Sequence, residues 1–396
     1  MNLKKTVLAV ASLVVCCHFA HAQTFVRGAD VSWCTEMEAD GKMFYDANGR
    51  ETEMMALLRQ IGMNAVRLRV WVNPETEYGP WCDKADVLVK ARRAHAQGLD
   101  LMIDFHYSDR FADPGQQNKP SAWAGLSGND LKQALKNHTT DILQALKDEG
   151  IEPRWVQVGN ETRPGMVFDD GKIDWNKSGS AVWNGYISLS NAGYEAVKSL
   201  LPEAKVIVHI DNGKDDNAWF FKAFKQYGGK FDMIGLSHYP DYTNWNSDNT
   251  SVATRIKELN NQFGVPVMLV ETGYDAWDQD RAFNVMDDLF NKVEGLSGCA
   301  GVFYWEPEVY GSWRPAIYTT WGWGAYNKGA FTSQGRPGKQ LKPFDGGTAG
   351  LIEIKNHEIP SEAYYDLLGR RAVLSGRRGI VVSRHHQKTI FTNQQK

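Results

Sequence analysis

The sequence predicts a (β/α)8 barrel followed by a short C-terminal tail. The chain has 396 residues, 42% of them hydrophobic and 23% charged, which is the composition of a folded soluble protein. Eight apolar, strand-like runs lie between residues 28 and 307, and they alternate with segments of helical periodicity. This alternation favours parallel strands joined by crossover helices, and eight such units in about 300 residues match a (β/α)8 barrel. A doubly wound sheet would more usually carry a glycine-rich phosphate loop after its first strand, and the sequence has none there.

The eight predicted strands share apolar character and lengths of a few residues. They are residues 28–32, 64–71, 100–106, 155–160, 205–210, 231–238, 265–270 and 300–305. Several of the segments between them place apolar residues at i, i+3, i+4 and i+7, which predicts amphipathic helices. These helical segments stop at Gly62, Gly150, Gly264 and Gly295, and glycine is a common signal for a helix C-terminus.

The first residues have the pattern of a secretory leader. Lys4 and Lys5 precede an apolar stretch that ends at Ala20, and Ala-His-Ala at 20–22 is a small-x-small cleavage site. We therefore predict a signal peptide over residues 1–22 and export to the periplasm, the cell surface or the medium. The apolar stretch is too short to span a membrane.

The cysteines leave two questions open. A lipoprotein leader acylated on Cys16 or Cys17 is a weaker alternative to the signal peptide, because neither cysteine follows Gly, Ala or Ser. The mature chain keeps Cys34, Cys82 and Cys299, which allow at most one disulfide. A bond between Cys34 and Cys82 and a pair of free buried thiols are equally good interpretations. The three show no metal-ligand spacing, and we predict neither a metal nor a cofactor.

Charge and aromatic content narrow the class of partner. The formal net charge is −3, and it becomes −5 once Lys4 and Lys5 leave with the leader. An acidic chain of this kind does not offer a nucleic-acid-binding surface. The 14 tryptophans exceed the usual share. Indole rings stack on the apolar faces of sugars, although some tryptophans must simply fill the core.

Two predicted strands end next to a glutamate. Residues 155–160 lead to Glu161, and Pro164 and Gly165 soon after it cannot extend a strand; residues 265–270 lead to Glu271. A single such glutamate is more often a solvated loop residue or a helix cap. A pair at the carboxyl ends of two barrel strands, about a hundred residues apart, is where a barrel enzyme places a general acid and a nucleophile.

Polar and aromatic residues also gather at the other strand ends and in the loops that follow. Arg67 and Arg69 are two residues apart and so point the same way, as do Asp104 and His106. A packed core has no use for so many desolvated charges, so we expect them to face one mouth of the barrel. The predicted substrate-binding residues are Asn160, Arg67, Arg69, Asp104, His106, Asp109, Asp113, His209, Asp211, His238, Tyr239 and Trp305. Long aromatic loops, including the one that carries Trp321 and Trp323, are expected to form the sides of a groove.

Eight short motifs resemble glycoside hydrolase family 53, the arabinogalactan endo-β-1,4-galactanases. The resemblance covers residues 28 to about 343. The motifs are Gly-Ala-Asp-Val-Ser (28–32), Val-Arg-Leu-Arg-Val-Trp-Val-Asn-Pro (66–74), Ser-Asp with Ala-Asp-Pro (108–114), Val-Gly-Asn-Glu (158–161), His-Ile-Asp-Asn-Gly (209–213), Ser-His-Tyr-Pro (237–240), Val-Glu-Thr (270–272) and Tyr-Trp-Glu-Pro (304–307). Asn-Glu after the fourth strand belongs to the whole clan, whereas the arginine-rich run and the Trp-Glu-Pro close are more specific to this family.

The resemblance implies a retaining, endo-acting enzyme whose partner is a polysaccharide, the β-1,4-galactan of pectin, and we expect a monomer. Glu161 would be the general acid, with a raised pKa, and Glu271 the ionised nucleophile. Two alternatives remain: a clan relative that acts on glucan or mannan, and a barrel that binds glycan without cleaving it. Intact glutamates at both strand ends argue against the second.

The clan resemblance also suggests roles for the neighbours of the two glutamates. Asn160 would hydrogen-bond the 2-hydroxyl of the reacting sugar, and Tyr239 would orient the nucleophile. Arg67 or Arg69 would keep the nucleophile ionised through its positive charge. Trp305 would be the stacking floor beneath the sugar.

The sequence departs from the family pattern after the seventh strand. Bacterial members that bind calcium do so there with a loop rich in Asp, Gly and His, whereas residues 273–280 read Gly-Tyr-Asp-Ala-Trp-Asp-Gln-Asp. These carboxylates could hold a cation, but separate structural acids are the interpretation we favour, and we predict no metal site.

The composition changes after about residue 345, where we place the end of the catalytic domain (23–345). Residues 346–350 read as a linker, and 379–382 as a short strand. The region 346–396 is similar to C-terminal segments of proteins that use type IX secretion. A remnant hairpin or a disordered basic tail is an equally good interpretation.

Overall fold

The computed structural model describes residues 24–74 and 79–346, together with four short strands nearer the C-terminus. Within 24–346, eight parallel strands pair in chain order and β1 closes on β8, so the predicted (β/α)8 barrel is confirmed. The strands are β1 (Val26–Asp30), β2 (Ala65–Val70), β3 (Asp100–Phe105), β4 (Trp155–Val158), β5 (Lys205–Ile210), β6 (Met233–His238), β7 (Val267–Thr272) and β8 (Cys299–Trp305). The bounds of β7 differ from the predicted bounds in a way that matters for the site. Strand β7 starts two residues late, after Pro266, which cannot donate to the sheet, and it runs on through Glu271.

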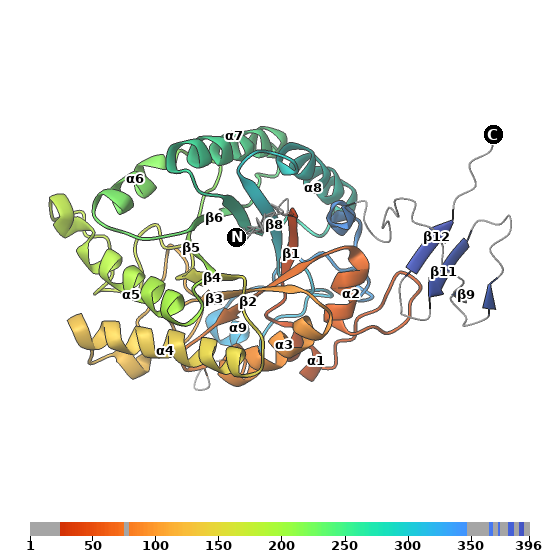
Figure 1. Cartoon of the computed structure of the whole chain (residues 1–396), viewed down its shortest axis with the longest axis horizontal. Coiled ribbons are helices and arrows are strands. Elements are labelled where there is room, and N and C mark those ends of the chain that lie inside the picture. Colours follow the sequence, from red (N-terminus) through yellow and green to blue (C-terminus); the bar gives the residue numbers. More distant parts are fainter. Residues whose placement is uncertain are drawn as a thin grey trace, which may run out of the picture.

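Helices surround the strands (Figure 1). They are α1 (Cys34–Ala39), α2 (Met54–Ile61), α3 (Lys84–Ala96), α4 (Gly128–Asp148), α5 (Asn184–Leu200), α6 (Ala218–Gln226), α7 (Trp245–Phe263), α8 (Gln279–Val293) and α9 (Ala316–Trp321). Two of the predicted glycine ends are left-handed C-caps, Gly62 with φ 107° and Gly264 with φ 67°, a conformation that a side chain disfavours. The barrel ends with a 3-10 helix, η4 (Lys339–Asp345), whose Phe344 packs on Phe290 of α8 with ring centroids 4.6 Å apart.

The interior of the barrel is apolar at one end and polar at the other. Alternate residues of each strand point inward, and near the strand starts these are apolar, among them Ala65, Met102, Trp155 and Ile207. Two residues further along the same strands the inward positions hold Arg67, Asp104, Gln157 and His209, all buried. The fold therefore brings buried polar groups together at the carboxyl end of the barrel.

The predicted signal peptide, residues 1–22, lies outside the described residues, and so does most of the predicted linker. Nearer the C-terminus the structure describes β9 (Tyr364–Asp366), β10 (Arg371–Ala372), β11 (Gly379–Ser383) and β12 (Lys388–Phe391), which form an antiparallel sheet in the order β10-β9-β11-β12. The strand predicted at 379–382 is β11. A role of this region in sorting stays a prediction.

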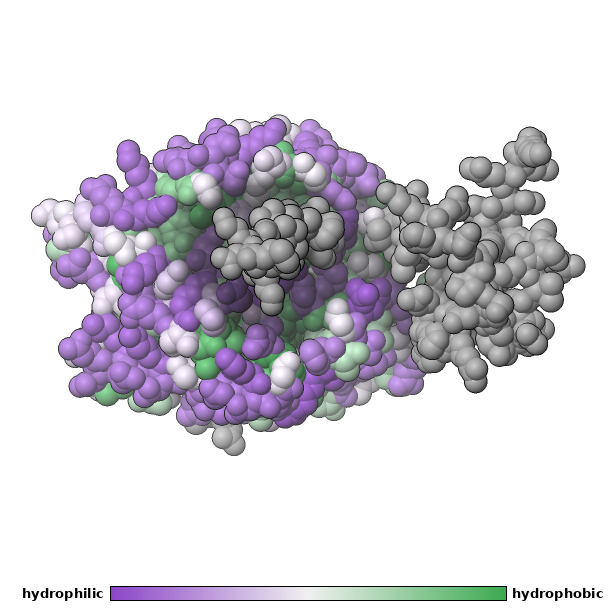
Figure 2. Space-filling view, viewed as in Figure 1, coloured by the Kyte–Doolittle hydropathy of each residue, from purple (hydrophilic) through white to green (hydrophobic). Residues whose placement is uncertain are grey.

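The surface is mostly hydrophilic on the face seen in Figure 2, with small hydrophobic patches between, and two cysteines are buried. Among the described helices, none is long and apolar enough to cross a membrane. Cys34 and Cys82 are free, buried thiols, so the alternative with a disulfide between them is wrong.

Candidate active site

A hollow of about 330 Å³ opens at the carboxyl end of the strands. Many of its lining residues were predicted from the sequence: His106, Asp113, Asn160, Glu161, Tyr239, Glu271 and Trp305. They come from loops and strand ends far apart in the chain, and the closed barrel brings them to one mouth. Both glutamates face the same space.

Glu271 is held on both of its oxygens. Its Oε1 lies 3.0 Å from Nη2 of Arg67, and its Oε2 accepts a hydrogen bond of 3.0 Å from the hydroxyl of Tyr239. The residue is 5% exposed. Burial raises the pKa of Glu271 to about 7, while the charge of Arg67 and the Tyr239 hydrogen bond act to lower it. Both contacts hold the carboxylate in one orientation.

Glu161 follows β4 in a left-handed conformation, with φ 47°, directly after Gly159 and Asn160. Its backbone N–H points to Nδ1 of His209 at 3.3 Å. Burial raises the pKa of Glu161 well above its usual value, and the negative charge of Glu271 raises it further; a hydrogen bond with Ser237 opposes both. These shifts favour a proton on Glu161 when Glu271 is ionised.

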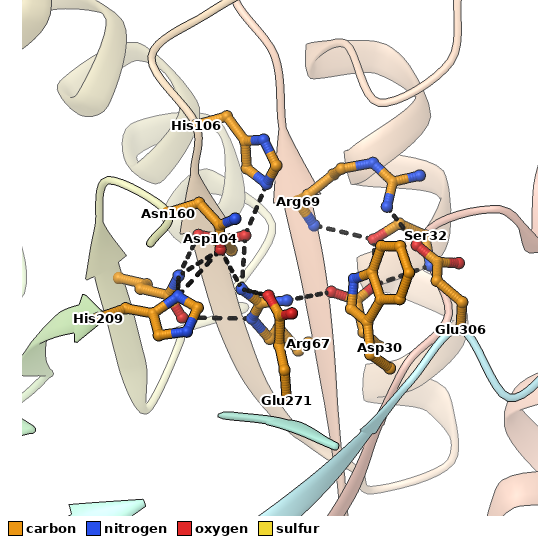
Figure 3. Close-up of polar contacts among 12 residues, drawn as sticks. Asp30, Ser32, Arg67, Arg69, Asp104, His106, Asn160, His209, Glu271 and Glu306 are labelled. Carbon is orange, nitrogen blue, oxygen red and sulfur yellow. Dashed lines mark hydrogen bonds and ion pairs between the residues drawn. The ribbon is translucent and has the colours of Figure 1, made fainter. Parts of the chain in front are cut away.

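Arg67 is the hub of the polar layer under the hollow (Figure 3). It is fully buried, and besides Glu271 it contacts Asp30 through Nη1 at 2.8 Å and Asp104 through Nη2 at 2.8 Å. The same Nη2 donates to Oδ1 of Asn160 at 2.7 Å. The neighbouring carboxylates hold the pKa of Arg67 above its usual value against the effect of burial. Of the two arginines expected near the nucleophile, Arg67 is the one that contacts it.

Arg69 lies elsewhere. Its guanidinium pairs with Glu306 (Figure 3). It sits over the ring of Trp33, 4.1 Å from the centroid, and over that of Phe111 at 4.8 Å. It does not line the hollow. Phe111, one of these rings, does line the hollow, and the predicted role of Arg69 in substrate binding stays a prediction.

A second carboxyl pair, Glu306 and Glu308, lies fully buried beside Arg69. Burial raises the pKa of Glu306 to about 7, while the charge of Arg69 acts to lower it. Burial and the charge of Glu306 raise the pKa of Glu308 well above its usual value. Oε1 of Glu308 accepts from the N–H of Trp33 at 3.2 Å, while Oε2 of each carboxyl is buried without a hydrogen-bond partner among the described residues. A proton on Glu308 removes the repulsion between the two buried carboxylates. No pattern in the sequence marks Glu308.

Asp104 and His106, predicted to share a face, are joined at 3.0 Å between Oδ2 and Nε2. Nδ1 of His106 accepts from the N–H of Ala112 at 3.0 Å, so the ring proton sits on Nε2 and points to Asp104. The side chain of Asn160 donates to the carbonyl of Ala112 at 2.8 Å. These bonds fix the position of Asn160 beside the two glutamates.

Asp109 and Asp113 brace loops. Asp109 accepts from the N–H of Asn73 at 3.0 Å and from the N–H and hydroxyl of Ser121 at 2.7 Å, and it does not line the hollow. Its oxygens join two loops, and the predicted contact of Asp109 with substrate stays a prediction. Asp113 lines the hollow, and its carboxylate closes a turn through the N–H of Gly115 at 2.7 Å.

The predicted histidines of β5 and β6 do not line the first hollow. His209 is buried beneath Asn160, where its Nε2 contacts the Ser237 hydroxyl at 2.8 Å; burial and the charge of Arg67 lower its pKa, so the ring is neutral. His238 contacts Oδ1 of Asn249 on α7 at 2.8 Å, and burial lowers its pKa to about 4. The predicted contact of His209 with substrate stays a prediction.

A second hollow, of about 320 Å³, adjoins the first and shares Glu161 and Tyr239 with it. It is also lined by Asp211, Lys214 and His238. Asp211 makes two hydrogen bonds with Arg163, of 2.7 and 2.6 Å. Glu161 therefore stands between two spaces, and Glu271 lines the first of them.

Several lining residues were missed. Phe111, Tyr318, Tyr326 and Lys328 border the first hollow beside the expected Trp323. Tyr326 and Lys328 lie about twenty residues beyond β8 in an irregular segment, where no periodic pattern marks them. A signal did exist for Gln157, a polar residue at an inward position of an apolar strand, and its amide donates to Asp104 at 2.6 Å.

The carboxylates after β7 have separate partners. Asp275 pairs with Lys328 at 2.8 Å, Asp278 caps α8, and Asp280 pairs with Lys339 at 2.5 Å. Over the described ranges, no group of three or more His, Cys, Asp or Glu side chains is arranged to hold a metal ion.

Comparisons with known proteins agree with this architecture. The family model described as Glycosyl hydrolase family 53 matches residues 26–288. A probable arabinogalactan endo-β-1,4-galactanase A of Neosartorya fischeri is 30% identical over 335 residues, which are 77% of this chain and 90% of the relative. An arabinogalactan endo-β-1,4-galactanase of Cellvibrio japonicus is 31% identical over 338 residues, 77% of this chain and 87% of the relative.

Solved structures give the same picture. The GH53 catalytic domain of Ignisphaera aggregans superposes with a TM-score of 0.71 and 29% identity, covering 81% of this chain and 95% of that one. A structure from a study of two fungal β-1,4-galactanases gives a TM-score of 0.69 and 28% identity, covering 81% and 98%.

Proposed function

Because the chain belongs to glycosyl hydrolase family 53, we propose that it is a retaining, endo-acting β-1,4-galactanase that cleaves the galactan of pectin, including type I arabinogalactan. The observation that carries this proposal is that Glu161 and Glu271 line one hollow, with Glu271 held by Arg67 and Tyr239. Export, which the predicted signal peptide implies, would bring the enzyme to its polysaccharide substrate.

In the first step, a carboxylate oxygen of Glu271 attacks the anomeric carbon of the sugar in the first hollow. The glycosidic C–O bond breaks, and the proton of Glu161 passes to the leaving oxygen. The raised pKa of Glu161 keeps that proton available. The product of this step is a glycosyl ester on Glu271 and a free leaving group.

In the second step, Glu161, now ionised, takes a proton from water. The water oxygen attacks the same anomeric carbon and displaces Glu271, so two inversions retain the β configuration. Loss of negative charge from Glu271 in the ester lowers the pKa of Glu161, since that charge is one cause of its elevation. The same carboxyl is thereby suited to act first as acid and then as base.

The remaining groups position the substrate. Asn160, fixed by Arg67 and by the Ala112 carbonyl, is the donor or acceptor for the 2-hydroxyl of the reacting sugar. Trp305, whose ring meets that of Tyr326 edge-on at 4.7 Å, is the stacking floor.

Product analysis tests the proposal. Linear β-1,4-galactan, a β-1,4-glucan and a β-1,4-mannan are digested in parallel, and NMR of the fresh products reports the anomer formed first. We expect oligosaccharides of intermediate length from galactan and an initial β anomer. Cleavage of glucan or mannan in preference to galactan would favour the clan-relative alternative, and an initial α anomer would exclude retention.

A further inference from the structure

Two exposed tryptophans, Trp175 and Trp219, lie beside each other with ring centroids 6.1 Å apart. Their exposed fractions are 64% and 43%. Trp183, which is buried, meets the first edge-on at 6.0 Å and the second at 6.5 Å. We call Trp175 and Trp219 the indole pair. Large aromatic side chains normally bury their faces, so two neighbouring indoles left in solvent are a candidate contact site.

The indole pair is held in place. Trp175 lies on a tight turn closed by Asp174, whose Oδ1 accepts from the N–H and from the side-chain amide of Asn176, each at 3.1 Å. Trp219 stands in the first turn of α6 and packs edge-on against the buried Phe220 at 5.9 Å. A site that is ordered beforehand loses little entropy when a ligand stacks on it.

The indole pair belongs to the catalytic end of the barrel. The loop that carries Trp175 starts just after Glu161 and stays tied to it, because the N–H of Ile173 donates to the carbonyl of Pro164 at 2.9 Å. Trp219 follows β5, and the ion pair of Arg163 with Asp211 joins the loops after β4 and β5. Loops after barrel strands lie at the carboxyl end, where both hollows open.

The two hollows indicate which way the polysaccharide would lie across this end of the barrel. The first holds Glu271 and Trp305, so under the proposed function it takes the sugar whose anomeric carbon is attacked. The second, which shares Glu161, then takes the leaving sugar. Asp211 lines the second hollow and is joined to the loops that carry the indole pair. The indole pair therefore lies on the leaving-group side.

We propose that the indole pair is a distal subsite that stacks on galactosyl units of the polymer beyond the leaving sugar. This inference rests on the proposed function. Because O4 of a β-1,4-linked galactosyl unit is axial, several C–H groups lie together on one ring face, and that apolar face stacks on an indole. Two indoles are far too small for a protein partner, which needs about 800 Å² on each side.

The test compares a long and a short substrate. We expect Trp175→Ala/Trp219→Ala to lower kcat/KM on long linear β-1,4-galactan about tenfold and to leave kcat/KM on an aryl β-galactobioside unchanged, because an aryl leaving group does not reach the indole pair. The matched control, Trp175→Phe/Trp219→Phe, keeps an aromatic ring at each position and should retain most activity on the polymer. An equal loss on both substrates, or wild-type activity of the alanine variant on the polymer, would overturn the proposal.

The position of cleavage tests whether the indole pair lies on the leaving-group side. Galactohexaose labelled at its reducing end is cleaved by wild type and by the alanine variant, and the labelled fragments are sized. Loss of a leaving-side subsite should shorten them; longer fragments would overturn this placement. Failure of the proposed function would give a different result: the wild-type enzyme would leave galactan uncut and would cleave another glycan. In that case the same pair of variants, compared on that glycan and its aryl glycoside, decides the role of the indole pair.

Discussion

The hydroxyl of Tyr239 donates to Oε2 of Glu271 at 3.0 Å, from the strand end next to that of the glutamate. Burial and the charge of Glu271 raise the pKa of Tyr239 well above its usual value, so the phenol keeps its proton and remains a donor. The hydrogen bond favours the ionised form of Glu271 and so opposes the effect of burial on its pKa. This contact links the geometry of the nucleophile to its charge.

The pH profile should report this link. Glu271 must be ionised to attack, so kcat/KM should fall as pH drops through its pKa of about 7, and Glu161 must be protonated, so kcat/KM should fall again at higher pH. Tyr239→Phe removes a contact that lowers the pKa of Glu271, so its acidic limb should move to higher pH. The control is Tyr45→Phe, whose hydroxyl contacts Met43 away from the hollow. An acidic limb that stays in place or moves to lower pH would refute this account.

Replacing each glutamate should separate their roles. Glu271→Ala removes the attacking atom, so activity should vanish whatever the leaving group. Glu161→Ala removes proton donation, which an activated aryl leaving group does not need, and the glycosyl ester then waits for a base. Azide needs no base and should restore turnover, giving the β-glycosyl azide, which NMR identifies. Rescue of a β product in Glu271→Ala instead would mean that the roles are exchanged.

Glu308 offers a test on stability. Its folded-state pKa is raised, so the proton it binds stabilises the fold fully below the unfolded pKa, and this contribution is lost as pH rises toward the folded value. Glu308→Gln imitates the protonated form at every pH. Relative to wild type it should gain stability as pH rises above about 4.5, by at most about 1.4 kcal/mol per pH unit. Denaturant midpoints between pH 5 and 8 measure this, with the exposed Glu152→Gln as control. Parallel curves for wild type and Glu308→Gln would contradict it.

Truncation should locate the end of the domain. A chain ending at Gly346 keeps η4, in which Leu341 and Phe344 are buried, so it should match the full chain in melting temperature and turnover. A chain ending at Gly338 loses both side chains and their packing on α8, and we expect a fall in melting temperature of several degrees. A large loss for the first chain would show that residues after 346 stabilise the barrel.

Much of the architecture could be inferred from the sequence because the signals are local. Alternating apolar runs mark strands and helices, and a glutamate at the end of an apolar run lies at the carboxyl end of the barrel whatever the rest of the chain does. The shared hollow of Glu161 and Glu271 followed from that reasoning. Asp104 and His106 were correctly placed on one face by the two-residue period of a strand.

Side-chain partners could not be inferred in this way. Arg67 and Arg69 are equivalent in the local pattern, yet Arg67 contacts Glu271 and Arg69 contacts Glu306. The partner of each arginine is the side chain that another strand places at the same height in the barrel. His209 and Glu308 differ from solvated residues through burial and neighbours remote in the chain, which set their pKa values. Hydrogen bonds and charge interactions act over a few ångströms, so they depend on distances that arise when the barrel closes.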